Sequence, residues 1–325
     1  MQTNKIKNKR IFLPGGAGFV GSYIVEELLK YSPEKIFIID NLVRGSYENM
    51  QSFHNNPIVE FEEQDIRNEK IINKYMALSD YCFHLAALRI NACAANPREG
   101  FEVMVKSTFE IADSAKRHNI KKLIYSSSAS VYGLAQHFPT PESDNPYDNQ
   151  TFYGAAKIFG EQLLRSYYHM FGLQYVSLRY FNVYGPRMDT DGKYTEVMIK
   201  WLDCIAQNSP PLIYGDGSTS MDFVYVKDIA KANVLALLSD KCDTAYNIGC
   251  GVETSLSELL NLLLKVNNST LKPGYREESS INPVSKRCAD ITRARDELGY
   301  APETDLETGL QLLSQWYNKN NNEHA

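Results

Sequence analysis

The sequence contains no long hydrophobic run and, apart from four basic residues near its start, no Lys/Arg-rich run. Near its start, four basic residues are followed by only three apolar residues, 11–13, which are too few for the core of a signal peptide. No stretch approaches the roughly 20 apolar residues that a membrane-spanning helix requires. With a formal net charge of −5, we expect neither a nucleic-acid partner nor a membrane partner.

Cysteine and histidine occur without the spacing of a metal site. The six cysteines form no Cys-x-x-Cys pair, and the six histidines are dispersed along the chain. Buried thiols in a reducing cytoplasm explain this distribution better than a disulfide framework does. We therefore expect a cytoplasmic protein without a bound metal.

A glycine-rich turn lies between the first predicted strand, residues 10–13, and the first predicted helix, residues 19–30. Glycines at such a place permit a tight turn and let the backbone approach a pyrophosphate at the N-terminus of the helix. The turn therefore predicts a dinucleotide-binding site. Its glycines are spaced as Gly16-x-Gly18-x-x-Gly21 and, counted from Gly15, as Gly-x-x-Gly-x-x-Gly.

An acidic residue ends the second predicted strand. Residues 35–39 form that strand, and Asp40 follows it, 19 residues beyond Gly21 (40 − 21). A carboxylate at this place accepts hydrogen bonds from the ribose hydroxyls of adenosine and repels a 2′-phosphate. The expected cofactor is therefore NAD rather than NADP.

Further apolar runs alternate with helical patterns in a chain of 325 residues. Strands are predicted at 58–61, 81–87, 122–125, 174–181 and 245–249, and helices at 98–118, 194–208, 227–238, 255–266, 287–298 and 305–317. The alternation predicts an α/β fold, a Rossmann-type doubly wound parallel sheet with a smaller, partly interleaved α/β substrate-binding lobe. We assign residues 1–182 and 222–249 to the Rossmann domain, and residues 183–221 and 250–325 to the lobe.

Two residues near the strand ends have more than one interpretation. Asp65, after the third strand, either lies where an adenine edge is read or caps a helix. His84 lies within the fourth strand, and we expect it to pack rather than to act in catalysis. The small residues that follow His84 would let a cofactor lie close to the backbone.

Tyr153 and Lys157 open a long amphipathic helix. At i and i+4 their side chains lie on one helical face. A free phenol has a pKa near 10. A neighbouring cation favours the phenolate, and a bound nicotinamide ring would add a second positive charge, so we expect these two cations together to lower the pKa of Tyr153. The pair is a candidate base for a sugar hydroxyl, although the same spacing also occurs by chance on helices.

Six motifs occur in order over residues 10–300. They are the glycine turn of residues 15–21, Asp40, residues 84–87 (His-Leu-Ala-Ala), residues 126–133 (Ser-Ser-Ser-Ala-Ser-Val-Tyr-Gly), the Tyr153/Lys157 pair and residues 179–182 (Arg-Tyr-Phe-Asn). The set resembles the extended short-chain dehydrogenase/reductase family, whose members act on nucleotide-diphosphate sugars, and within it the UDP-glucose 4-epimerase branch. The resemblance implies that Tyr153 is the base and Lys157 holds the nicotinamide ribose. Ser128 is implied to hydrogen-bond the reacting sugar oxygen.

The motifs and the resemblance together assign the binding residues. Cofactor contacts are expected from Gly15, Gly18, Phe19, Val20, Gly21, Asp40, Asn41, Asp65, Ile66, Leu85, Ala86, Ala87, Tyr153, Lys157 and Tyr180. Contacts with a nucleotide-diphosphate sugar are expected from Arg89, Ser128, Tyr153, Asn182 and Arg287. Ser126 and Ser127 are expected to have only a structural role in a loop.

The chain departs from the family pattern where the diphosphate should bind. Met221 stands in place of an arginine that usually grips the diphosphate, and a thioether neither donates hydrogen bonds nor carries charge. Met104 and Ser107 stand where the family has Asn and Gly, so another polar contact is expected to be missing. Arg287 and Arg89 are alternative partners for the diphosphate, or plain surface residues.

A second departure concerns the reaction. Ala129 and Ser130 stand where the 4,6-dehydratases carry Asp-Glu and the decarboxylases a Glu. Without those acids, the resemblance implies a site fitted only for reversible oxidation at one carbon.

The leading hypothesis is therefore an NAD-dependent epimerase acting at C4 of a nucleotide-diphosphate hexose, with UDP-sugars as the first candidates. A 4-keto-sugar reductase that releases its cofactor would use the same three residues, Ser128, Tyr153 and Lys157. A non-catalytic NAD-binding protein is disfavoured because all three are intact. Apolar residues on the helices near 98–118 and 153–170 predict a homodimer, as is common in the family, although packing against the sheet also explains them.

Overall fold

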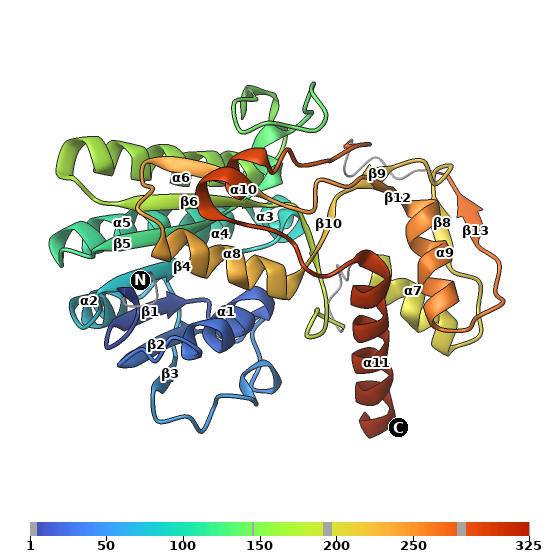
Figure 1. Cartoon of the computed structure of the whole chain (residues 1–325), viewed down its shortest axis with the longest axis horizontal. Helices are drawn as coiled ribbons and strands as arrows, with labels where there is room; N and C mark the ends of the chain where they lie inside the picture. The colour runs from blue at the N-terminus through green and yellow to red at the C-terminus, as the bar shows by residue number, and fades with distance from the viewer. Residues whose placement is uncertain (1–4, 145, 191–196, 278–283, 325) are drawn as a thin grey trace.

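A seven-stranded parallel sheet forms the centre of the protein (Figure 1). The computed structural model describes residues 5–144, 146–190, 197–277 and 284–324. The strand order β11-β6-β5-β4-β1-β2-β3 reverses direction between β1 and β4, which is the pattern of a doubly wound sheet. The predicted α/β fold is confirmed. The strands are β1 (Arg10–Pro14), β2 (Lys35–Asp40), β3 (Val59–Glu63), β4 (Tyr81–His84), β5 (Lys122–Ser128), β6 (Tyr175–Tyr180) and β11 (Thr244–Ile248).

Helices cover both faces of this sheet. Along β1, Ile11 and Leu13 belong to one apolar cluster and Phe12 to the other, because successive strand side chains point to opposite faces. The first cluster packs under α1 (Phe19–Leu29) and α8 (Val226–Leu238). The second packs under α2 (Glu69–Ala77), α5 (Ser107–Arg117) and α6 (Phe152–Phe171).

The helix predicted for residues 98–118 is interrupted. A π-helical turn, η3 (Phe101–Lys106), separates α4 (Pro97–Gly100) from α5. Two side-chain hydroxyls donate hydrogen bonds to backbone carbonyls of this turn. Ser107 Oγ donates to the Glu102 carbonyl at 2.9 Å, and Thr108 Oγ1 donates to the Met104 carbonyl at 2.8 Å. A hydrophobic period read from the sequence does not reveal such a local widening of the helix.

The helix predicted for residues 287–298 is also wrong at its start. α10 (Thr292–Leu298) begins five residues later because the preceding segment is extended. The Cys288 carbonyl accepts a hydrogen bond from Thr140 N at 2.7 Å, and Lys286 bridges to Ser220. These long-range pairings outweigh local helix propensity. The last helix, α11 (Leu306–His324), extends beyond the predicted residue 317, and α3 (Ile90–Ala95) was not predicted.

A second apolar core lies beside the sheet, at the right of Figure 1. Side chains of α7 (Val197–Ala206), α9 (Leu256–Val266) and α11 form most of it. The first residues of the helix predicted for 194–208 lie outside the described residues. Three short sheets accompany this core: β7 (Asn182–Tyr184) with β10 (Phe223–Tyr225), β8 (Leu212–Tyr214) with β13 (Gly274–Arg276), and β9 (Ser220–Met221) with β12 (Thr254–Ser255).

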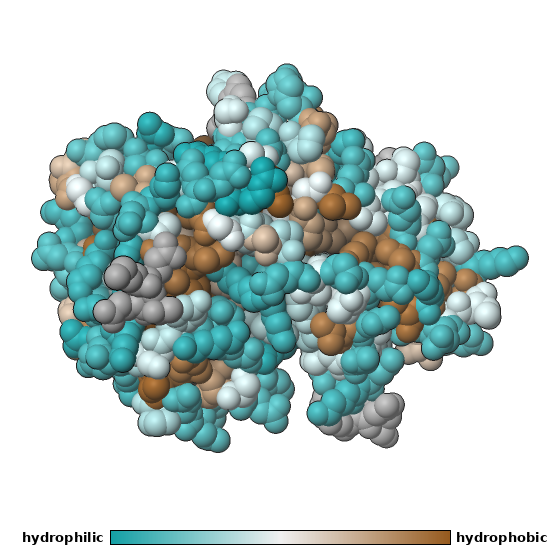
Figure 2. Space-filling model, in the orientation of Figure 1, coloured by the Kyte–Doolittle hydropathy of each residue, from teal (hydrophilic) through white to brown (hydrophobic). Residues whose placement is uncertain are grey.

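Hydrophilic side chains cover most of the face shown in Figure 2, and apolar residues gather there in smaller patches. Large apolar side chains are also exposed on or beside α5 and α6, where Phe109 is 42% and Phe171 47% exposed. In the part of the chain that the structure describes, no helix is long and apolar enough to cross a membrane.

Candidate active site

The glycine turn after β1 leaves room at the carboxyl edge of the sheet. Gly15 has φ +87°, and a Cβ at this position would lie 2.5 Å from Ala86 N, which follows β4. Only glycine therefore lets the two strand ends approach so closely. The N-cap of α1 is Gly18, so the free N–H groups of that helix begin directly at the turn. This is the cradle that a pyrophosphate requires.

Asp40 lies at the end of β2, beside this turn. Its carboxylate accepts hydrogen bonds from Ala17 N at 3.2 Å and from Leu42 N at 3.0 Å. Burial raises the pKa of Asp40, and these backbone hydrogen bonds together with Arg44 oppose that rise. The carboxylate is therefore held rigidly against the turn, in the place where the ribose of a dinucleotide is expected.

A cavity of about 260 Å³ runs along the strand ends and connects these groups with α6. The structure places nearly all the predicted cofactor residues in its wall: Gly15, Gly18, Phe19, Val20, Gly21, Asp40, Asn41, Ile66, Leu85, Ala86, Ala87, Tyr153, Lys157 and Tyr180. Arg44, Gln64, Arg67 and Glu99 also line it and were not predicted. The sequence could have indicated Gln64 and Arg67, because both follow a predicted strand at the edge of the sheet where ligands bind.

Asp65 lies behind this wall rather than in it. Its carboxylate accepts a hydrogen bond from Asn41 Nδ2 at 2.9 Å and pairs with the Arg67 guanidinium at 2.6 Å. The hydrogen bonds from Arg67 lower the pKa of Asp65 to about 2. The N-cap of α2 is Asn68, so Asp65 does not cap that helix. It positions two residues that do line the cavity.

Helix α6 carries the candidate base into the other end of the cavity. Thr151 caps the helix, with Oγ1 accepting from Gly154 N at 3.0 Å. One turn further on, Lys157 is 3% exposed, and its Nζ donates to the Ser126 carbonyl at 2.6 Å. That amino group lies 5.6 Å from the centre of the Tyr153 ring. The predicted pair therefore shares one face of α6.

In the protein without a bound cofactor, the pKa of Tyr153 lies above its ordinary value. Burial raises it, and a hydrogen bond with Ser128 is the largest opposing effect. Burial also lowers the pKa of Lys157 to about 8, so the cation itself is weakened by the same surroundings. In the protein alone the phenol is therefore protonated at neutral pH. Ser128, at the end of β5, lies within hydrogen-bonding reach of Tyr153.

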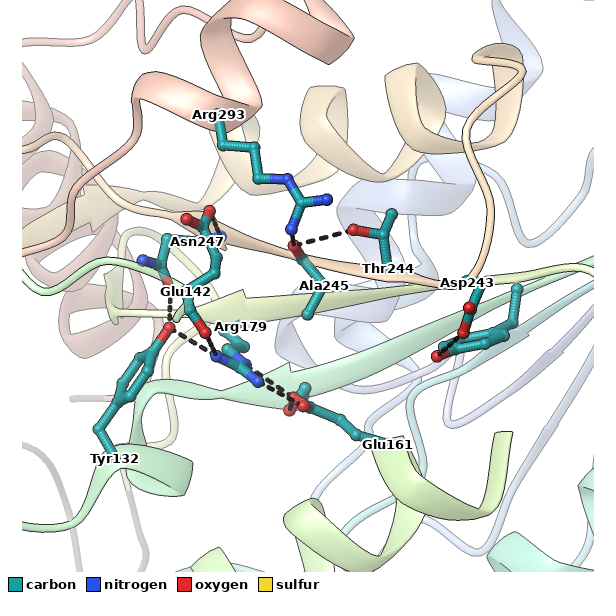
Figure 3. A network of polar contacts seen from close by, with 11 residues as sticks. Tyr132, Glu142, Glu161, Arg179, Asp243, Thr244, Ala245, Asn247 and Arg293 are labelled. Atoms are coloured by element: carbon teal, nitrogen blue, oxygen red, sulfur yellow. Dashed lines mark hydrogen bonds and ion pairs between the residues drawn. The ribbon is translucent and has the colours of Figure 1, made fainter. Parts of the chain in front are cut away.

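A buried polar network fixes α6 against β5 and β6 (Figure 3). Glu161 accepts hydrogen bonds from Arg179 Nε at 3.0 Å and Nη2 at 2.7 Å, and from Ser127 Oγ at 2.5 Å. Arg179 Nη1 also donates to Tyr132 Oη at 2.8 Å. Ser126 and Ser127 thus belong to β5 rather than to a loop, which corrects the sequence interpretation. Glu161 was missed because its partners lie in other elements.

The predicted substrate residues are more scattered. Arg89 is the N-cap of α3, with its guanidinium 3.6 Å from Asp189. Asn182 begins β7, where its N–H donates to the Asp222 carbonyl at 3.0 Å. Arg287 lies in the extended segment before α10 and reaches Ser130 Oγ at 3.5 Å. None of the three lines the large cavity.

The two methionines that depart from the family pattern pack against apolar residues, Met104 fully buried and Met221 partly buried. Met104 is 2% exposed, and its sulfur accepts a hydrogen bond from Leu88 N at 3.2 Å. Met221 pairs with Thr254 between β9 and β12 and packs against the second core. Neither thioether replaces the polar contact that the family pattern has at its position.

His84 has a structural position, as predicted. Its Nε2 lies 2.9 Å from Thr108 Oγ1, and burial lowers its pKa to about 3, so the ring is neutral. Among the described residues, no group of three or more His, Cys, Asp or Glu could hold a metal ion. The candidate chemistry therefore centres on Ser128, Tyr153 and Lys157.

Burial of Lys157 predicts a pH-dependent effect on stability. The pKa falls from 10.5 to about 8 on folding, so the folded state disfavours the charged amine below pH 8, and this penalty disappears as the pH rises to 10.5. The gap corresponds to about 3 kcal/mol. Relative to Lys157→Met, the wild type should therefore gain up to about 3 kcal/mol of unfolding free energy between pH 7 and 10.5.

Urea unfolding of both proteins across this pH range measures the difference. Lys265→Met, which removes an exposed lysine paired with Glu307, should show no comparable pH trend. A wild-type advantage that stays constant from pH 7 to 10.5 would show that Lys157 is charged without penalty.

One protein family matches most of the chain. Residues 11–249 match the NAD dependent epimerase/dehydratase family. A putative UDP-glucose 4-epimerase of Methanocaldococcus jannaschii is 33% identical over 319 residues, which cover 96% of this chain and 99% of the relative. Proteins of Bacillus cytotoxicus and Arabidopsis thaliana that are named as UDP-uronic acid decarboxylases also match, at 28–29% identity.

Solved structures agree with this assignment. The UDP-N-acetylglucosamine 4-epimerase from Methanobrevibacter ruminantium M1 has a TM-score of 0.90 and 34% identity, covering 97% of this chain and 99% of its own. The UDP-glucuronic acid 4-epimerase from Bacillus cereus, solved with UDP-glucuronic acid and NAD, has a TM-score of 0.88 and 27% identity over 95% and 99%. The glycine turn, the acid after β2 and the Tyr/Lys helix thus occur in a chain that belongs to the NAD-dependent epimerase/dehydratase family.

Proposed function

We propose that this protein epimerises C4 of a nucleotide-diphosphate hexose, with UDP-sugars as the first candidates. One observation carries the proposal: Tyr153 and Lys157 line one end of the cavity that begins at the glycine turn, and Ser128 is within hydrogen-bonding reach of Tyr153. NAD is the cofactor of the family. Relatives named as UDP-sugar 4-epimerases support the choice of reaction. We place the reaction in the cytoplasm.

The two parts of the chain have separate tasks in this proposal. Residues 1–182 and 222–249 bind NAD through the glycine turn and Asp40. Residues 183–221 and 250–325 form the lobe that binds the nucleotide sugar, and the second apolar core supports that lobe as a unit. Arg187 ties the two together, since its guanidinium contacts Glu26 of α1 at 2.5 Å and Ser22 at 3.1 Å.

Three side chains handle the proton. Ser128 Oγ holds the sugar 4-hydroxyl beside the phenol, and Tyr153 Oη removes its proton. Lys157, held by the Ser126 carbonyl, keeps positive charge on the same face of the helix. Bound NAD supplies a hydride acceptor for C4 and a positive charge that favours the phenolate. Tyr153 Oη returns the proton after the 4-keto sugar has presented its other face.

The residues after Ser128 favour epimerisation over elimination or decarboxylation. Ala129 and Ser130 are both buried, and neither carries a carboxylate. General acid–base chemistry at a second carbon would need another titratable group near the sugar. Ala129 and Ser130 supply none, which supports oxidation and reduction at a single carbon.

The proposal predicts turnover without added cofactor. An epimerase restores its cofactor in each cycle, so the purified protein should interconvert a UDP-hexose and its C4 epimer with no net change in absorbance at 340 nm. Deuterium placed at C4 of the substrate should remain at C4 of the product. Mass spectrometry of the product measures this. Loss of the label, or a requirement for stoichiometric NADH, would assign the protein as a 4-keto-sugar reductase instead.

Tyr153→Phe should remove nearly all turnover while leaving the nucleotide sugar bound. The proton acceptor acts mainly in the transition state, so kcat should fall by about 10²–10⁴-fold with little change in ligand affinity. Ser128→Ala should cost about 10²-fold. Tyr167→Phe is the matched control on the same helix, because its hydroxyl bonds Asp113 away from the site. Near-normal rates for Tyr153→Phe would place the acid–base group elsewhere.

We further propose a homodimer that pairs α5 and α6 with their copies. Phe109, Met170 and Phe171 are exposed there, whereas Tyr167 of α6 is buried in the core. Light scattering at micromolar concentration should give twice the chain mass, and Phe109→Glu should give a monomer. Tyr275→Glu, at an exposed aromatic residue on β13, should leave the mass unchanged. A monomeric wild type would refute this pairing.

A further inference from the structure

The guanidinium of Arg287 is largely enclosed, and no acidic partner for it is found among the described residues. Its Nε is buried and makes no hydrogen bond within the described part of the chain. Its Nη1 contact with Ser130 Oγ is long, at 3.5 Å. An arginine has five N–H donors, so this side chain keeps unused donors in its enclosure. Burial lowers the pKa of Arg287 to about 10, which shows that its charge is poorly compensated.

Arg179 shows how the same protein compensates a buried guanidinium elsewhere. Both oxygens of Glu161 accept hydrogen bonds from Arg179, at 3.0 and 2.7 Å (Figure 3). Buried charges are normally paired in this way because an isolated charge is costly to remove from water. Among the described residues Arg287 has no such carboxylate, which leaves its charge available to an anionic ligand.

Arg287 faces a second, small cavity next to the reacting groups. Ser130, two residues after Ser128, and Thr151, the cap of the helix that carries Tyr153, both line it. None of the described residues in its wall is acidic. Arg287 and Tyr153 lie close enough to affect each other electrostatically. The unpaired charge is therefore at the end of the site where the sugar reacts.

The size of this cavity limits which anion fits. Its volume is about 20 Å³, and a single water-sized group needs about 10–15 Å³ on the same scale. The space admits one small polar group, such as a carboxylate. A diphosphate, the other partner considered for Arg287 from the sequence, has two tetrahedral groups and is larger than this space.

We propose that Arg287 binds a carboxylate carried by the sugar itself, so that the preferred substrate is a nucleotide-diphosphate hexuronate. The inference rests on the proposed function, since it concerns the same site. A planar guanidinium matches a carboxylate with two parallel, charge-assisted hydrogen bonds. Arg287 then selects the substituent of the sugar, while the reacting hydroxyl stays with Ser128 and Tyr153.

Calorimetric titration of the NAD-loaded protein with UDP, UDP-glucose and UDP-glucuronate tests the proposal. The Tyr153→Phe background prevents turnover during the titration. UDP-glucuronate should bind at least about 10-fold more tightly than UDP-glucose. Adding Arg287→Gln should weaken the binding of UDP-glucuronate on the order of 10²-fold, as expected for loss of one partner of a buried charge pair. UDP and UDP-glucose should change by less than about twofold.

Two further variants act as controls. Arg293→Gln removes a guanidinium that is 42% exposed and paired with Glu297, and it should leave all three affinities unchanged. Arg287→Lys keeps the charge but loses the two parallel hydrogen bonds. Its affinity for UDP-glucuronate should therefore lie between that of the protein with Arg287 and that of Arg287→Gln. The preference for UDP-glucuronate over UDP-glucose is measured with Arg287 intact. That measurement tests the proposal even if Arg287→Gln fails to fold.

The other outcomes are distinguishable. If Arg287→Gln lowers the affinities for UDP, UDP-glucose and UDP-glucuronate equally, Arg287 binds the diphosphate and the inference is overturned. It is also overturned if UDP-glucose binds as tightly as UDP-glucuronate when Arg287 is intact. Conversion of UDP-glucose by the wild type would in both cases leave the epimerase proposal standing. If neither UDP-sugar binds or is converted, the proposed function fails and this inference fails with it.

Discussion

The packing of α6 against β5 and β6 is the constraint on which the site depends. On successive turns of that helix, Lys157 donates to the Ser126 carbonyl, Gly160 leaves space for the ring of Tyr125, and Glu161 receives Arg179 and Ser127. A side chain at position 160 would collide with that ring, so the helix could not approach the sheet. Because three consecutive contacts lock the helix, Tyr153 at its first turn has a fixed place beside Ser128.

The same burial that fixes these groups also sets their charge. Burial lowers the pKa of Lys157 to about 8, raises that of Tyr153 and keeps His84 neutral. At neutral pH the amino group of Lys157 is still mostly protonated, whereas the phenol of Tyr153 is not ionised. Arg287 adds a second positive charge, partly buried, that the described residues do not neutralise. The protonation states of these side chains thus depend on one property, the low access of water to a small group of ionisable side chains.

The two halves of the site differ in how closely they follow the family pattern. The dinucleotide half keeps its glycine turn and its acid, and backbone hydrogen bonds hold Asp40 in place. Met221 stands where the family has a polar group, and it packs against the second core. Met104 likewise replaces a polar residue, and it packs against Cys93 and Ala156 of α6. These replacements keep the packing and change only which ligand groups can be held. Variation of substrate within one fold is expected to take this form.

Local patterns in the sequence were enough for the parallel sheet, the glycine turn, Asp40 and the Tyr153/Lys157 pair. Each depends on residues close together in the chain, whose spacing has a direct meaning for backbone and helical face. Only the tertiary structure revealed the π-helical turn before α5, the late start of α10 and the partnership of Glu161 with Arg179. It also decided the pKa values and the enclosure of Arg287, because burial and long-range hydrogen bonds arise from segments far apart in the sequence. Spacing along the chain contains no information about which of these segments meet.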